Sequence, residues 1–166
     1  QILTHYPHNI EIAKRITQQE ANISAENQSQ IHVPELAKDL LEQIGFEARK
    51  SEYVDVKSGV STRMSITAFE NLISTAERRL LITHDSKTSI RMNDFLGVIT
   101  AINGKIELVY EGEQEGAGEV AYHLISSAIK SLFPLYFPKI EKLEKPNEQG
   151  PYDDLLAWFF KENELF

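Results

Sequence analysis

Residues 59–81, GVSTRMSITAFENLISTAERRLL, join a short Gly/Ser/Thr-rich stretch to a strongly amphipathic pattern. The apolar residues of this pattern recur every three or four positions, as is typical of a helix with one buried face: Ala68, Phe69, Leu72, Ile73, Ala76 and Leu80. Thr67 is followed three residues later by Glu70, a capping-box pattern, so we expect the helix to begin at Thr67. Arg63 precedes that start, and its role is the first question that the sequence raises.

Similar apolar patterns predict further helices along most of the chain. They begin at or near Asn9, Pro34, Asn93, Ala117 and Asp153. Asn103-Gly104 should end the fourth helix in a left-handed turn, and Pro134 should end the fifth. Strand patterns are sparse, and residues 105–111 (KIELVYE) form either a short strand or an extended connection. The expected fold class is therefore all-α, with at most one short extended segment.

Three polar stretches are interpreted as irregular segments. Residues 22–30 are rich in Asn, Gln and Ser, and residues 111–118 (EGEQEGAG) are acidic and rich in glycine, so both predict loops. Residues 139–151 (KIEKLEKPNEQGP) predict a charged linker.

Composition restricts the classes of function. The 166 residues suit one domain, with 42% apolar and 25% charged residues. The absence of cysteine excludes disulfides, thiolate metal sites and a cysteine nucleophile, and it fits the reducing cytoplasm, where we place the protein. The net charge of −8 argues against nucleic acid and anionic membranes as partners. No apolar run reaches the roughly 20 residues of a membrane span.

Most catalytic signatures are missing from the sequence. The histidines (His5, His8, His32, His84 and His123) have no metal-binding spacing, so no metal site is predicted. Residues 56–59 (VKSG) lack the glycine pattern of a phosphate loop, and the glutamates of residues 111–118 would repel phosphate. Two charged pairs, Lys38-Asp39 and Glu47/Arg49, are interpreted as solvated helix faces, and Asp153-Asp154 as partners of a helix dipole. No catalytic residue is predicted.

Arg63 is the one candidate for ligand contact. Gly59 would allow a close backbone approach, Ser61 is small, and an arginine beyond them could present its planar donors to a phosphate. From residue chemistry alone, however, an exposed or salt-bridged arginine is the simpler interpretation.

Three motifs occur in the same order as in a known family, and they favour a ligand-binding role for Arg63. Gly59-Val60-Ser61-Thr62-Arg63 is similar to a G-x-S-x-R pattern, Tyr6-Pro7 with Glu11 to a Y-P-x-x-x-E entry, and Ile90 with Asn93-Asp94 to the start of a later helix. Together they cover residues 4 to 102. This part of the chain resembles the helical lid of AAA+ ATPases of the MoxR and magnesium-chelatase ATPase-subunit group.

The resemblance implies a domain division and a set of roles. Residues 1–103 would be the lid, and residues 104–166 a C-terminal helical extension packed on or beside it. Arg63 would be sensor 2, which contacts the terminal phosphates of ATP in its own or a neighbouring subunit, and Gly59 and Ser61 would support it. Thr62 replaces the family's usual proline. The implied cofactors of the full-length protein are ATP and Mg²⁺.

The resemblance also implies partners and a missing part. Neighbouring AAA+ subunits would form a ring that uses ATP hydrolysis to remodel a partner, often a protein with a von Willebrand A domain, for metal insertion or complex maturation. The Walker motifs of the family lie upstream of Tyr6-Pro7 and are not in this sequence. Since the sequence begins with Gln1 rather than methionine, we expect a fragment that is inactive by itself.

A second hypothesis needs no nucleotide. The chain would then be a stand-alone acidic helical module that binds protein, with Arg63 in a structural role. The aromatic run Trp158-Phe159-Phe160 would either pack on the chain's own core or bind a partner.

Overall fold

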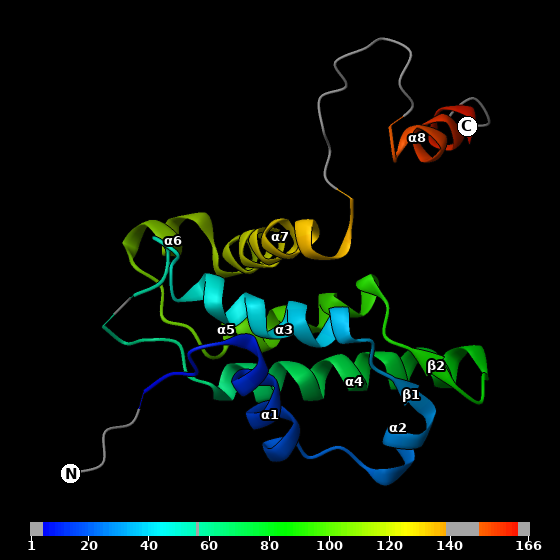
Figure 1. Cartoon of the computed structure of the whole chain (residues 1–166). Coiled ribbons are helices and arrows are strands. Elements are labelled where there is room, and N and C mark those ends of the chain that lie inside the picture. The colour runs from blue at the N-terminus through cyan, green and yellow to red at the C-terminus, as the bar shows by residue number, and fades with distance from the viewer. Residues whose placement is uncertain (1–4, 56, 139–149, 163–166) are drawn as a thin grey trace. The chain divides into compact units, whose positions relative to one another are not determined.

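The computed structural model describes residues 5–55, 57–138 and 150–162. The fold is all-α, as predicted, with one short pair of strands (Figure 1). The helices are α1 (Ile10–Glu20), α2 (Ala25–Gln30), α3 (Glu35–Ala48), α4 (Arg63–Thr83), the 3-10 helix η1 (Met92–Val98), α5 (Ile99–Asn103), α6 (Tyr110–Glu115), α7 (Ala117–Tyr136) and α8 (Asp153–Glu162). Strands β1 (Ile31–His32) and β2 (Thr88–Ser89) pair in parallel, with Ile31 opposite Thr88. The chain divides into two compact units, Gln1–Leu132 and Phe133–Phe166.

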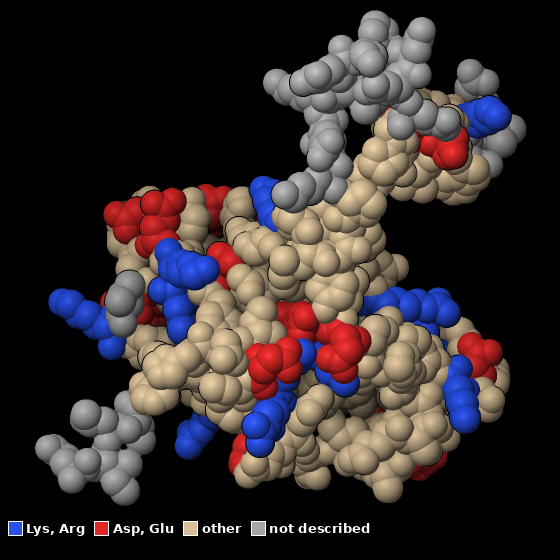
Figure 2. Space-filling view, in the orientation of Figure 1, with Lys and Arg blue, Asp and Glu red and all other residues tan. Residues whose placement is uncertain are grey.

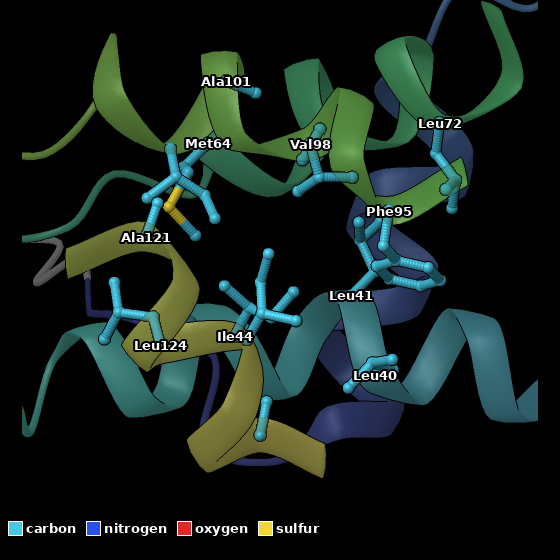
Figure 3. Packing of buried hydrophobic residues seen from close by; sticks show 14 of the residues in the cluster. Leu40, Leu41, Ile44, Met64, Leu72, Phe95, Val98, Ala101, Ala121 and Leu124 are labelled. Atoms are coloured by element: carbon cyan, nitrogen blue, oxygen red, sulfur yellow. The ribbon is translucent and has the colours of Figure 1, made fainter. Parts of the chain in front are cut away.

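Helix α4 lies at the centre of the first unit and packs against α1, α3, η1 and α5 (Figure 1). Its predicted apolar face is buried except for Phe69, which is partly buried, and Leu72 and Ala76 have no exposed surface. Figure 3 shows Ala121 and Leu124 of α7 in the same cluster as Ile44 of α3 and Met64 of α4. The start of α7 therefore shares one apolar core with the helices before residue 103.

The N-termini of two helices test the capping predictions. Asn9 caps α1 as predicted, since its Oδ1 accepts a hydrogen bond from the Ile12 amide at 2.9 Å. The capping box at Thr67 was wrong: α4 begins at Arg63, with Thr62 at the N-cap. Burial explains the earlier start, because Met64 is only 1% exposed and its packing continues the apolar face upstream. Glu70 instead accepts a hydrogen bond from the Asn22 amide at 2.9 Å.

Two of the predicted loops contain helices. Residues 25–30 form α2, in which Ser24 Oγ accepts from the Asn27 amide at 3.1 Å. Residues 110–115 form α6 and α7 begins at Ala117, so only Gly116 of the acidic stretch lies outside a helix. Gly112 allows this helix to lie close to Tyr53, because a Cβ at position 112 would be 2.6 Å from the Tyr53 carbonyl oxygen. A helix without apolar periodicity, such as α2, which buries no residue, leaves no pattern in the sequence.

The segment before α6 is the extended connection rather than a regular strand. Its contact with residues 53–55 is a single antiparallel bridge between Val54 and Leu108. The Asp55 amide donates to the Glu107 carbonyl oxygen at 2.8 Å, and the Val109 amide donates to the Tyr53 carbonyl oxygen at 3.0 Å.

An arginine on α4 fixes η1 and β2. Arg79 Nη2 is 2.8 Å from Asp94 Oδ2, and Nε is 3.2 Å from Oδ1. The same guanidinium donates to the Thr88 hydroxyl and the Ser89 carbonyl oxygen. The hydrogen bonds with Asp94 raise the pKa of Arg79. Asp94 also accepts from the Arg91 amide at 2.7 Å, so one buried carboxylate both caps η1 and holds it to α4.

Close packing continues from η1 into α5. A Cβ on Gly97 would overlap the Thr75 hydroxyl, so glycine sets the separation between η1 and α4. Helix α5 ends at Asn103 as predicted. Gly104, however, has φ −84° and ψ −2°, which is right-handed and not the left-handed turn that we expected.

The Lys38-Asp39 part of α3 is not simply a solvated face. Lys14 of α1, whose side chain is 10% exposed, lies 2.7 Å from Asp39 and 3.3 Å from Glu35. Burial acts to lower the pKa of Lys14, but the hydrogen bonds to Asp39, Glu11 and Glu35 outweigh it and raise the pKa above its usual value. Hydrogen bonds from Lys38 and Lys14 lower the pKa of Glu35. This cluster joins α1 to α3.

Helix α7 continues beyond its predicted end, because Pro134 lies within its last turn and the helix reaches Tyr136. In the second unit, α8 begins with Asp153 and Asp154 as predicted, and Asp153 Oδ2 accepts from the Gly150 amide at 2.6 Å. Residues 139–149 of the predicted linker lie outside the described residues. Among the helices described, none is long and apolar enough to cross a membrane.

Candidate functional site

Residues 59–62, here called the Arg63 loop, lead directly into α4. Gly59 has φ 70°, in the left-handed region that favours glycine, and its amide donates to the Asp55 carbonyl oxygen at 3.1 Å. Val60 is 1% exposed and anchors the loop in the core. Ser61 Oγ accepts from the Arg63 amide at 3.2 Å, so the two predicted supporting residues, Gly59 and Ser61, both shape this loop.

The turn just before the loop is ordered by one carboxylate. Asp55 Oδ1 accepts from the Lys57 amide at 3.0 Å, and Oδ2 accepts from the Ser58 hydroxyl at 2.7 Å. The hydrogen bonds from Ser58, with a further one from the Lys57 amide, lower the pKa of Asp55. Asp55 therefore acts as the acceptor of an Asx turn that delivers the chain to Gly59.

Arg63 is the first residue of α4, and its side chain is exposed. Within residues 5–55, 57–138 and 150–162, its guanidinium makes no hydrogen bond or ion pair. The following residues, Met64 and Ser65, are buried and hold the backbone in place. The result is a fixed backbone position with a free cationic group, which suits contact with an anion from outside the described chain.

The predicted entry motif meets the Arg63 loop. A Cβ on Gly59 would overlap the Tyr6 hydroxyl and lie 3.5 Å from Tyr6 Cζ, so a larger residue would have to displace the end of the tyrosine side chain. Tyr6 precedes α1 by four positions, and Gly59 precedes α4 by the same number. Two motifs more than fifty residues apart are therefore in contact.

Arg49, interpreted from the sequence as part of a solvated face, is half-buried beside this contact. Its guanidinium carbon is 4.6 Å from the centre of the Tyr6 ring and 5.3 Å from that of Phe46. Nη2 donates to the Val60 carbonyl oxygen at 3.5 Å. Burial lowers the pKa of Arg49, and the charges of Tyr6 and Glu42 act in the opposite direction. No local sequence pattern could have identified this role, since the partners lie far away along the chain.

Glu42 is a second buried polar residue that the sequence did not reveal. It is 4% exposed, on the face of α3 that meets α1 and α4. Thr17 Oγ1 donates to Glu42 Oε1 at 2.6 Å, and the Ser65 hydroxyl also bonds to this carboxyl group. Burial raises the pKa of Glu42, against the opposing effects of Thr17, Ser65 and Arg49. Glu42 thus joins three helices beneath the Arg63 loop.

A separate hollow lies away from the Arg63 loop. An open groove of about 910 Å³ is lined by residues of α2, β1, α3, α4 and β2, among them Ile23, His32, Lys38, Phe69 and Ile73. The Arg63 loop does not line this groove. The described residues contain no group of three or more His, Cys, Asp or Glu side chains that could hold a metal ion. His5 and His8 stack on each other, with ring centres 4.1 Å apart.

Comparison with models of known protein families, with curated proteins and with solved structures finds no match.

Proposed function

We propose that this chain is the helical lid part of a chelatase-like AAA+ ATPase, with Arg63 as its sensor 2. The observation that carries the proposal is the exposed guanidinium of Arg63, without a partner in the described chain, on a backbone fixed by the buried residues Val60 and Met64. The contact between Tyr6 and Gly59 supports it, because two motifs of the resemblance meet at the base of the same loop.

In this proposal the contacts of Arg63 depend on whether ATP or ADP is bound. A guanidinium that contacts the β- and γ-phosphates stabilises the charge that develops during phosphoryl transfer. Loss of the γ-phosphate would remove part of that contact, so the lid would change position between ATP and ADP. ATP and Mg²⁺ would be held mainly by the upstream Walker motifs, in the cytoplasm and in a ring of identical subunits. The ring would remodel a partner, such as a protein with a von Willebrand A domain, for metal insertion or complex maturation.

The test is the ATP turnover of the longer protein that contains residues 1–166. Arg63→Ala should lower kcat by about 10²–10³, the usual cost of one donor to a transition-state oxyanion. Arg78→Ala is the matched control, since Arg78 is also an exposed arginine on α4. Circular dichroism should show that both variants stay folded. Unchanged turnover of the Arg63 variant would exclude a sensor role.

The reading frame that encodes the chain gives a second, independent test. A G-x-x-x-x-G-K-[ST] motif within the few hundred preceding codons is the expected finding, because the phosphates need that loop. A start codon close to Gln1 would contradict the proposal.

The alternative is a stand-alone acidic module that binds protein. It is favoured by the exposed apolar residues of α8, where Trp158 is 54% and Phe160 is 72% exposed. Figure 2 shows acidic side chains gathered over α6, whose first turn carries Glu111 and Glu113. Under this alternative, replacing Trp158 and Phe160 with serine would abolish partner binding, while Arg63→Ala would have no effect on it.

A further inference from the structure

Arg49 connects three segments that are distant in sequence. It ends α3, its guanidinium lies against the Tyr6 ring that precedes α1, and its Nη2 bonds to the Val60 carbonyl oxygen in the Arg63 loop. Tyr6 in turn fills the space that Gly59 leaves open. Tyr6, Arg49 and Val60 thus form one contact cluster at the base of the loop.

Burying a cation in this cluster would be energetically unfavourable if its only role were to fill space. Among the described residues, Arg49 Nε is buried without a hydrogen-bond partner. Buried charges of this kind can often be replaced by apolar groups without loss of stability. The planar guanidinium does what an apolar side chain cannot: it faces the rings of Tyr6 and Phe46 and also donates to a backbone carbonyl.

We propose that Arg49 is a positioning residue for Arg63. By holding the Val60 carbonyl and the Tyr6 ring together, it fixes the direction in which the loop enters α4, and so the point from which Arg63 reaches outward. The position of the chain before α1 is thereby coupled to the position of Arg63. The role of Arg63 itself rests on the proposed function, whereas the coupling rests on the contacts of Arg49.

Hydrogen exchange on the 166-residue chain tests the coupling without nucleotide. Arg49→Met should speed exchange of the Gly59, Arg63 and Met64 amides, which are hydrogen-bonded in the loop, by about fivefold or more. Amides in the middle of α3 and α4 should stay within twofold. Arg49→Lys keeps the positive charge but loses the planar guanidinium group, so it should increase exchange of the same loop amides. This variant replaces Arg49→Met in the test if the Met variant does not fold.

Variants of the ring supply the matched control. Tyr6→Leu removes the aromatic face and should reproduce the effect of Arg49→Met, whereas Tyr6→Phe keeps that face, loses only the hydroxyl beside Gly59 and should have a smaller effect on loop exchange. Unchanged loop exchange in the Arg49 variants, or an equal increase throughout the chain, would overturn the coupling.

ATP turnover of the longer protein tests whether Arg49 acts through Arg63. Arg49→Lys should lower kcat in the otherwise unaltered protein but cause no further loss when Arg63→Ala is already present. Independent, multiplicative losses would overturn the positioning role. If Arg63→Ala alone leaves turnover unchanged, the proposed function fails and the positioning of a sensor fails with it, while the exchange measurement still decides whether Arg49 orders the loop.

Discussion

Gly59 shows how strongly one residue constrains the candidate site. A side chain at this position must adopt φ 70° and displace the Tyr6 hydroxyl. Gly59→Ala should therefore lower the free energy of unfolding by about 1–2 kcal/mol, the usual cost of a left-handed non-glycine residue. Urea unfolding measures the change. Gly118→Ala is the control: a Cβ there meets nothing within 4 Å and the residue is helical, so stability should stay equal or rise.

Glu42 should make stability depend on pH in a direction opposite to that of most carboxylates. Burial raises its folded-state pKa above the ordinary value of 4.5. Its stabilising contribution is therefore full below pH 4.5 and is lost as the pH rises through the folded-state pKa. Glu42→Gln removes this loss, so the stability of the variant relative to the natural protein should increase between pH 4 and pH 7.

Urea unfolding at several pH values measures that difference. The Glu52→Gln variant, at an exposed glutamate, supplies the baseline for a change of Glu to Gln at the surface. A difference for Glu42→Gln that stays constant across the range would show that the buried carboxyl group does not titrate with a raised pKa.

At the scale of the element, alanine substitutions at Asn9 of α1 and Thr67 of α4 should have different effects on stability. Asn9→Ala removes the side-chain oxygen that accepts from the Ile12 amide, so it should cost about 1 kcal/mol. Thr67 lies inside α4, where alanine is the better helix former, so Thr67→Ala should be neutral or slightly stabilising. Thermal unfolding of both variants checks this. A loss of stability on Thr67→Ala as large as that on Asn9→Ala would contradict the observed start of α4.

The elements also show what a sequence can and cannot predict. Helices with a long apolar stripe, such as α3, α4 and α7, were predicted because their burial has a period of 3.6 residues. Helices α2 and α6 were missed because they are short and polar, and are held by a cap at Ser24 and by the space at Gly112. The start of α4 was misplaced because Thr67 and Glu70 fit a local pattern, while the burial of Met64 depends on the whole fold.

The candidate site also contains both residues that the sequence could identify and residues that it could not. Arg63 could be selected from its neighbours in sequence, since Gly59 and Ser61 lie within four residues of it. Arg49 and Glu42 could not, because their partners Tyr6, Thr17 and Ser65 come from other helices or segments. A buried charge on a helix looks like any solvated charge until the packing is known.

At the scale of the whole molecule, the core predicts which part of the chain folds independently. Every residue of the buried apolar cluster lies at or before Leu132. A chain that ends at Phe137 should therefore unfold cooperatively, with a Tm within about 4 °C of the 166-residue chain. A chain that ends at Gly116 loses Val120, Ala121 and Leu124 from the core and should be severely destabilised. Calorimetry compares the three chains. Loss of the unfolding transition in the chain that ends at Phe137 would show that α8 is needed for folding.

The contact between Gly97 and Thr75 has a consequence for the evolution of this chain. Since a methyl group at position 97 would overlap the Thr75 hydroxyl, alanine fits at position 97 only if the Thr75 side chain turns away or is replaced by a smaller one. Order then matters: a smaller residue at position 75 makes room for a methyl group at position 97, whereas Gly97→Ala first has to displace the Thr75 hydroxyl from its hydrogen bond to the Asn71 carbonyl oxygen. The two positions are therefore coupled, and the effect of a substitution at one depends on the residue at the other.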